Sequence, residues 1–389
     1  MSCPDASKYV FFDSAHPTEK TYKIEATEML KTALQPPIVQ MFSKRLHYSL
    51  LFTILQFMLS SSMATSGKIP AIIVFGDSTV DTGNNNNRPT ISKANFPPYG
   101  RDFDGGIATG RFSNGRLVTD FISEFLGLPP TVPAYLDTSY TIDQLATGVT
   151  FASGGSGLDN LTAAIMSAIP LRQQLQYFNE YKEKLKLALG ESTANMIITE
   201  ALYCFSIGHV DILQNVLLGR LRSAPEYVTN LVSHAEAAIR DIYYMGARKI
   251  VFTGLVPVGC TPIVMTLTLQ EPGHCNEEYN QLAQRFNSEL QEAVSKLNGE
   301  LVGVQVVYSE TYSVVSRILA NPSDYGFANS VQGCCGTGLI EMGFLCRPEE
   351  PLMCQDDTKY VFFDSVHPTE GTFKIVANEF LENALTVFL

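Results

Sequence analysis

The sequence has no cluster of lysine or arginine residues. Of its 389 residues, 27 are basic and 39 are acidic, which gives a formal net charge of -12. Nucleic acids and anionic membrane surfaces are bound through basic patches, so we expect neither as a partner. Hydrophobic residues make up 45% of the chain and charged residues 17%, which is typical of a globular protein with a large core and excludes a disordered one.

The candidate export segment is too short to span a membrane. Its apolar run from Tyr48 to Leu59 has about a dozen residues, whereas a spanning helix needs about 20. Lys44 and Arg45 precede this run and a small-residue segment ends at Ala64, so we interpret residues 41–64 as a secretory signal peptide rather than a buried core helix. Export is expected if translation starts near Met41; a start at Met1 would displace the signal and put export in doubt.

The cysteines lack the paired C-x-x-C spacing of a zinc site. Cys204 lies in the apolar run ALYCFSIG and is predicted to be a buried free thiol. Six further cysteines allow three disulfides with 15 possible connectivities: Cys260, Cys275, Cys334, Cys335, Cys346 and Cys354. Asn160 begins an Asn-Leu-Thr glycosylation acceptor, so we also expect a glycoprotein.

Short apolar runs alternate with longer segments of helical periodicity. The runs have strand length and are bounded by turn residues, at 71–78, 148–155, 201–208, 248–255 and 303–310. Four clear helical segments lie around and between them, at 117–128, 171–190, 227–246 and 277–299. This alternation predicts a parallel sheet of five strands with helices on both faces, an α/β fold of three layers, α/β/α. Functional residues should follow the carboxyl ends of its strands.

Ser78 follows the first run, in FGDSTVDTGNNN. A serine in a turn at the carboxyl edge of a sheet suits a nucleophile, although Asp or Ser also commonly caps an ordinary strand-to-helix turn. A calcium loop is a third interpretation, but Thr82 stands where such a loop needs glycine.

Asp364 precedes His367 by three residues, and Pro368 follows. At the start of a helix this carboxylate can reach the far nitrogen of the imidazole while the near nitrogen faces a serine. The alternative is a helix cap beside an idle histidine. Together with Ser78, the pair supplies a nucleophile, an orienting carboxylate and a general base, in the chain order Ser, Asp, His.

Five segments together resemble the plant GDSL esterase/lipase family of SGNH hydrolases: FGDSTVDTGNNN, NFPPYGRDFDGGIATGRFSNGR, GVTFASGGSG, GARKIVFTGLVPVGCTP and KYVFFDSVHPTE. The resemblance runs from about Ile69 to the C-terminus. It implies a flavodoxin-like, secreted serine hydrolase that cleaves lipid or other small-molecule or glycan esters, or transfers their acyl groups. It implies no metal or organic cofactor, and we expect a monomer.

The same resemblance assigns roles to individual residues. Ser78, Asp364 and His367 match the catalytic residues, and Ser78 also matches an oxyanion donor through its backbone. Gly155 matches the second backbone donor to the oxyanion, with Gly154 as the adjacent candidate.

One position departs from the family pattern. Its third block reads G-x-N-D, in which the Asn side chain donates to the oxyanion, but the chain has Gly208-His209-Val210-Asp211. Val210 cannot donate, which predicts a weakened oxyanion hole, and His209 should point away from the site. Thr150, where the family usually has Asn, and Phe363, where it often has Trp, remove no catalytic role.

A segment of the C-terminus is duplicated near the N-terminus. The match pairs Cys3–Leu34 with Cys354–Leu385, and about two thirds of the positions are identical. Asp13 and His16 repeat the catalytic pair, but no FGDS strand precedes them, so we interpret them as non-functional. The predicted organisation is a paralogous fragment at 1–40 outside the fold, the signal at 41–64 and a hydrolase domain at 65–389.

Two functions remain open at this point. The first is an ester hydrolase or acyltransferase, impaired or specialised, that uses Ser78, His367 and Asp364. The second is a non-catalytic relative that binds esters or glycans on the same scaffold. Three retained catalytic residue types favour the enzyme.

Overall fold

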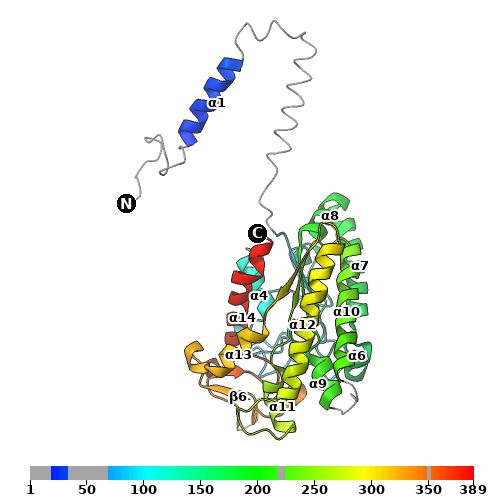
Figure 1. The fold of residues 1–389 in the computed structure, drawn as a ribbon, viewed down its shortest axis with the longest axis vertical. Coiled ribbons are helices and arrows are strands. Elements are labelled where there is room, and N and C mark those ends of the chain that lie inside the picture. The colour runs from blue at the N-terminus through cyan, green and yellow to red at the C-terminus, as the bar shows by residue number, and fades with distance from the viewer. Residues whose placement is uncertain (1–18, 34–68, 218–223, 348–351) are drawn as a thin grey trace, which may run out of the picture. The chain divides into compact units, whose positions relative to one another are not determined.

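The computed structural model describes residues 19–33, 69–217, 224–347 and 352–389. The chain divides into two compact units, Met1–Ser66 and Gly67–Leu389. In the first unit the described residues form one helix, α1 (Glu19–Ala33). All other described elements belong to the second unit (Figure 1).

A parallel five-stranded sheet forms the centre of the second unit, with strand order β2-β1-β3-β4-β5. This is the flavodoxin-like order. The strands are β1 (Ile72–Gly76), β2 (Gly148–Thr150), β3 (Leu202–Ser206), β4 (Lys249–Thr253) and β5 (Gln305–Ser309). Each lies within a run predicted from the sequence, and the α/β prediction is confirmed. The second strand is much shorter than its run, because the chain turns into the FASGG loop after Thr150.

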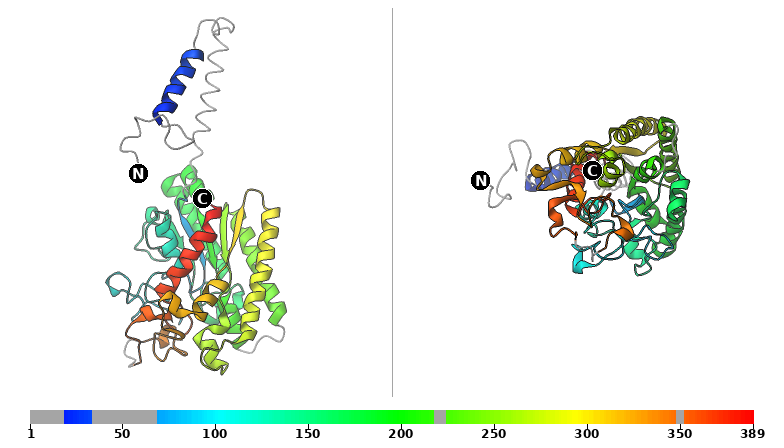
Figure 2. Two further views of the ribbon diagram at one scale, coloured as in Figure 1. Left: turned by 60° about the vertical axis from the view of Figure 1, so that its left-hand side comes forward. Right: turned by 90° about the horizontal axis from the view of Figure 1, so that it is seen from below.

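Helices cover both faces of the sheet, as Figures 1 and 2 show. One core cluster joins one face of the sheet to α7, α8, α10 and α12, and a second joins the opposite face to α4 and α14. The helices of this unit are α4 (Val118–Phe125), α5 (Ile142–Leu145), α6 (Asn160–Met166), α7 (Leu171–Leu189), α8 (Glu191–Glu200), α9 (His209–Leu217), α10 (Ala224–Tyr244), α11 (Pro262–Leu267), α12 (Glu277–Glu300), α13 (Tyr312–Ala320) and α14 (Glu370–Asn383).

Alternating side chains along the strands separate the two cores. On the face toward α7 and α10, phenyl rings stack across neighbouring strands: the Phe75 ring lies 5.3 Å from that of Phe151 and 5.0 Å from that of Phe205. Phe252 continues the row at 5.5 Å from Phe205. Such cross-strand aromatic pairs stabilise the register that brings the strand ends together.

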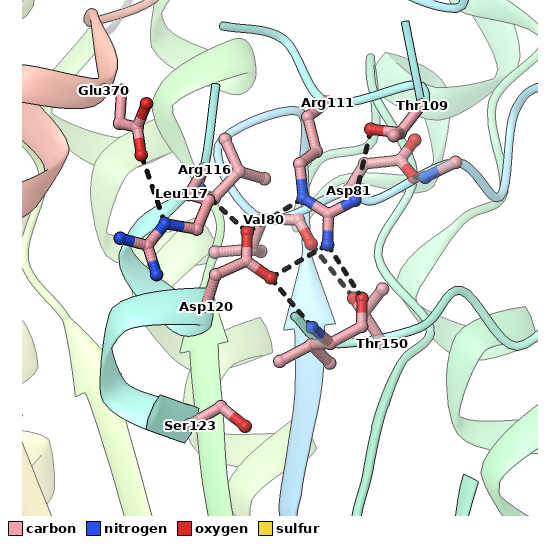
Figure 3. Close-up of polar contacts among 12 residues, drawn as sticks. Val80, Asp81, Thr109, Arg111, Arg116, Leu117, Asp120, Ser123, Thr150 and Glu370 are labelled. Atoms are coloured by element: carbon pink, nitrogen blue, oxygen red, sulfur yellow. Dashed lines mark hydrogen bonds and ion pairs between the residues drawn. The ribbon is translucent and has the colours of Figure 1, made fainter. Parts of the chain in front are cut away.

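A buried ion pair ties the loop before α4 to the sheet region (Figure 3). The Arg111 guanidinium binds both carboxylate oxygens of Asp120, at 2.8 Å each. Asp120 also accepts the backbone N–H groups of Leu117, at 2.9 Å, and Val132, at 2.8 Å. Because every charged atom has a partner, the pair can remain buried and fix the start of α4.

A second, two-stranded parallel sheet lies outside the main one. It consists of β6 (Asn329–Gly333) and β7 (Tyr360–Phe362). The disulfides Cys334–Cys354 and Cys335–Cys346 close this region, and Cys260–Cys275 lies near α11. The expectation of three bridges is confirmed, and Cys204 is a buried free thiol among the described residues, as predicted.

Candidate active site

Ser78 lies in a sharp turn two residues beyond the end of β1. Gly76 has a φ of 156°, and a Cβ atom there would collide with the carbonyl oxygen of Ser206 on β3. The Gln174 side chain from α7 accepts the Gly76 N–H at 3.0 Å and donates to the Gly76 carbonyl at 2.9 Å. Glycine is therefore required at position 76, and the turn presents Ser78 at the carboxyl edge of the sheet.

The loop after β7 carries Asp364 and His367. The Phe363 N–H donates to the carbonyl of His367 at 2.7 Å, which closes the loop into a tight turn. The Cys335 N–H donates to the Phe363 carbonyl at 2.8 Å, so a disulfide-bonded residue supports the turn from outside. The next helix, α14, begins at Glu370 with Thr369 as its N-cap, just after Pro368.

The structure brings Ser78, His367 and Asp364 into one hydrogen-bonded line. Ser78 Oγ lies 2.7 Å from His367 Nε2, and His367 Nδ1 lies 2.7 Å from Asp364 Oδ2. The other carboxylate oxygen of Asp364 accepts the N–H groups of Val366 at 2.8 Å and His367 at 2.7 Å. Because Asp364 binds Nδ1 of His367, the other ring nitrogen, Nε2, can accept the proton of Ser78. This is the arrangement of a nucleophile, a general base and an orienting carboxylate.

Tyr99 is a further member of this network that the sequence reasoning missed. Its hydroxyl donates to Asp364 Oδ2 at 2.7 Å and accepts the Gly343 N–H at 2.7 Å. Burial, and next the neighbouring Asp364 carboxylate, raise the pKa of Tyr99 well above its usual value, so the phenol keeps its proton and remains a donor. The signal in the sequence is the NFPPYG segment, which contains Tyr99 and contributes to the family resemblance.

The two glycines after β2 differ in what their N–H groups do. The Gly154 N–H donates to Asp81 Oδ2 at 2.8 Å. No hydrogen-bond partner is seen for the Gly155 N–H, or for that of Ser78, within the described parts of the chain. Asp81 Oδ1 also accepts the Gly83 and Asn84 N–H groups, at 2.8 Å each, so its oxygens bind backbone rather than a cation.

Val210 and His209 begin α9 beside Ser78. Both side chains line the same cavity as Ser78, and that of Val210 offers no polar atom to it. His209 Nε2 accepts the Val256 N–H at 3.2 Å, and its Nδ1 lies 3.6 Å from Asp77 Oδ2. Neither His209 Nδ1 nor Asp77 Oδ2 has a hydrogen-bond partner among the described residues. The prediction that His209 points away from the site is wrong, because its imidazole lines the cavity next to Ser78.

Asp211 ties α9 to the loop after β2. Its oxygens accept the Leu158 N–H at 2.7 Å, the Asp159 N–H at 3.1 Å and the Thr162 hydroxyl at 2.7 Å. Burial raises the pKa of Asp211 to about 7, although these hydrogen bonds lower it. Burial likewise raises the pKa of Asp81 to about 6. Asp81 and Asp211 therefore hold the loops around Ser78 through hydrogen bonds, and the free-energy cost of burying their charges depends on pH.

The remaining sequence predictions concern residues that are not part of the hydrogen-bonded line at Ser78. Asp13, His16 and the signal segment at 41–64 lie outside the described residues. Asn160 is the exposed first residue of α6, and the Thr150 hydroxyl donates to the Val80 carbonyl at 3.0 Å. Within the described ranges, no group of His, Cys, Asp and Glu could hold a metal ion, and no helix has the length and apolarity to cross a membrane.

A flavodoxin-like parallel sheet with a serine, a histidine and an aspartate beside its carboxyl edge is the architecture of the SGNH hydrolases. The family model described as GDSL-like Lipase/Acylhydrolase matches residues 72–380. The chain belongs to this family, and with it to the carboxylic ester hydrolases.

Curated plant proteins are similar over most of the chain. GDSL esterase/lipase At4g26790 of Arabidopsis thaliana is 51% identical over 328 residues, which cover 83% of this chain and 93% of that protein. GDSL esterase/lipase At2g42990 of the same plant is 49% identical over 341 residues, covering 86% of this chain and 97% of that protein. A third, GDSL esterase/lipase At2g04570, is 46% identical over 348 residues, covering 88% and 99%.

Proposed function

We propose that the protein hydrolyses carboxylic esters of lipids or other acylated small molecules through Ser78, His367 and Asp364. The observation that carries the proposal is the hydrogen-bonded line of 2.7 Å contacts from Ser78 Oγ to Asp364 Oδ2. His367 takes the serine proton as Ser78 attacks the ester carbonyl, and then returns it to the leaving alcohol. Water, activated by the same imidazole, releases the acid from the acyl-serine.

The oxyanion is stabilised by the N–H groups of Ser78 and Gly155 in this proposal. Both are without a partner in the described chain, whereas the Gly154 N–H is engaged by Asp81. Val210 supplies no third donor. Loss of one such donor costs about a hundred- to a thousand-fold in kcat, or about 3 to 4 kcal/mol, so we infer a slow or specialised enzyme.

Ester turnover by three proteins tests this function: the wild type, Ser78→Ala and Val210→Asn. We expect the wild type to hydrolyse aryl acetate slowly and Ser78→Ala to lose this activity. Val210→Asn should raise kcat, by up to about a hundredfold, because it restores a donor to the oxyanion.

The second candidate function, binding without catalysis, is favoured by Val210 alone. It predicts no turnover by the wild type and none gained by Val210→Asn. The same measurements therefore separate an impaired enzyme from a binding protein.

We also propose that the active form is secreted and monomeric, and that residues 1–64 are not part of it. The disulfides support export, since such bonds persist in oxidising compartments. The match to At2g42990 covers 97% of that relative but only 86% of this chain, so this chain has residues outside the match. These additional residues support the proposal.

A further inference from the structure

An apolar cavity begins at Ser78 and His367 and continues into the layer between the sheet and two helices. Its volume is about 130 Å³. The deep wall consists of apolar side chains and one thiol, from α4, the strands and α14: Ile122, Cys204, Val251, Phe373, Val376 and Phe380. Figure 1 shows α4 and α14 together on this side of the sheet. We call this space the acyl pocket.

The pocket extends away from the nucleophile along the strands. Ser206, the last residue of β3, pairs with Gly76 in the turn that carries Ser78. Cys204 pairs with Val251 two residues further from the edge, which is about 7 Å deeper.

The helix that forms the outer wall gives a similar depth. Phe373 lies in the first turn of α14, close to the His367 loop, and Phe380 is seven residues further along the helix. This separation is about 10 Å, which fits an extended chain of roughly eight carbons.

Protein interiors rarely contain voids larger than a water molecule. Apolar cavities of about 150 Å³ stay dry and bind a ligand of the size of benzene. The six side chains of the deep wall carry no charge, and the Cys204 thiol is their only polar group. The hydroxyl of Thr119 on α4 also lines the pocket and has no hydrogen-bond partner among the described residues, so it can bind one water or one polar substrate atom. The chemistry of the wall therefore fits a hydrocarbon chain.

The reaction order indicates which half of an ester the pocket holds. The alcohol must leave first, and the acyl group stays on Ser78 until water releases it. Cys204 and Phe380 at the deep end are buried, so an alcohol held there would have to leave past the acylated Ser78. We propose that the acyl pocket binds the acyl chain and selects straight-chain esters of about six to eight carbons. This inference rests on the proposed function.

Aryl esters of increasing chain length test the selection. We expect kcat/KM to rise about fourfold per methylene from butyrate to octanoate, because each added methylene leaves water, and to fall at dodecanoate. Equal kcat/KM from acetate to octanoate would overturn the acyl pocket while leaving the proposed function intact. An absence of turnover with every ester would instead count against the function. In that case binding of octanoate to the wild type, measured by calorimetry, decides the pocket.

Two variants on one helix separate blocking of the pocket from general damage. Val376→Phe adds a ring inside the pocket, whereas Ile375→Phe adds the same ring at the next half-buried position, outside its lining. Val376→Phe should lower kcat/KM for octanoate at least tenfold and leave acetate nearly unchanged; Ile375→Phe should change neither. Phe380→Leu should shift the preference to longer chains.

A separate comparison tests whether the pocket holds the acyl chain or the alcohol. If octyl acetate is preferred over methyl octanoate and Val376→Phe abolishes that preference, the pocket holds the alcohol. Equal losses on all esters in Val376→Phe would also overturn the proposal.

Discussion

At the scale of single residues, the charge of Asp364 is surrounded by four donors. Three come from the loop itself: the N–H groups of Val366 and His367, and the ring of His367. The fourth is the Tyr99 hydroxyl, which reaches the carboxylate from a segment 265 positions away. We interpret Tyr99 as a positioning residue, since it orients Asp364 without facing Ser78.

Removing this hydroxyl should change both activity and its pH dependence. In Tyr99→Phe the Gly343 N–H loses its acceptor, and Asp364 loses a donor that stabilises its charge. We expect kcat to fall about tenfold and unfolding free energy to fall by about 1 to 3 kcal/mol. The acid limb of kcat/KM should move to higher pH, because a less stabilised carboxylate holds imidazolium more strongly.

Tyr203→Phe is the matched control. Tyr203 is also buried, and its hydroxyl donates to the Ile198 carbonyl at 2.6 Å, in the core away from the site. This variant should lose similar stability with no shift of the pH profile. A profile that shifts equally in both variants, or in neither, would contradict the positioning role.

At the scale of elements, the local sequence pattern determines which segments form helices and strands. It does not determine which of these segments are buried. The duplicated segment illustrates this difference. Its helix α1 covers the residues that match α14, so the same sequence pattern forms the same helix twice. Phe380 of α14 is 5% exposed because it packs against α4 and the sheet, whereas the described residues of the first unit offer the matching Met29 of α1 no second element to pack against.

The contact between α9 and the loop after β2 should make stability depend on pH. An aspartate in the unfolded chain has a pKa of about 3.9. The pKa of Asp211 is raised to about 7 in the fold, so between these values the folded protein keeps a proton that the unfolded chain loses. This contribution is present below pH ~4 and is lost as the pH rises to about 7.

Urea unfolding of the wild type and Asp211→Asn at several pH values measures this contribution. We expect Asp211→Asn to have a lower free energy of unfolding than the wild type. The difference should shrink as the pH rises from ~4 to ~7, because only the wild type has a titrating carboxyl at position 211. Asp143→Asn, at an exposed aspartate of α5, should parallel the wild type. If the stability of Asp211→Asn also parallels that of the wild type over this pH range, Asp211 is not the source of the pH dependence.

At the scale of the whole molecule, the site joins segments from both ends of the hydrolase unit. Ser78 follows the first strand of the sheet and His367 precedes the last α-helix. The small sheet and its two disulfides hold the second of these segments. The bridges close residues 334–354, and the N–H groups of Cys334 and Cys335 donate to the carbonyls of Phe362 and Phe363, next to Asp364. Covalent closure limits the conformations open to this supporting segment.

The N-terminal proposal also belongs to the whole molecule. Sequencing of the N-terminus and intact-mass measurement of the secreted protein should show a start near Thr65. Detection of residues 3–34 in the secreted protein would contradict it. Gel filtration of the same sample checks the monomer.

The sequence by itself determined the five strands, the α/β class, the family and the three residue types of the proposed catalytic line. Each of these depends on local periodicity or on short motifs, which a chain carries without its fold. The tertiary structure decided which of 15 disulfide connectivities forms, which glycine N–H remains available, that Tyr99 reaches Asp364, and where the acyl pocket ends. These depend on contacts between segments far apart in the chain, and such contacts are fixed only when all layers pack together.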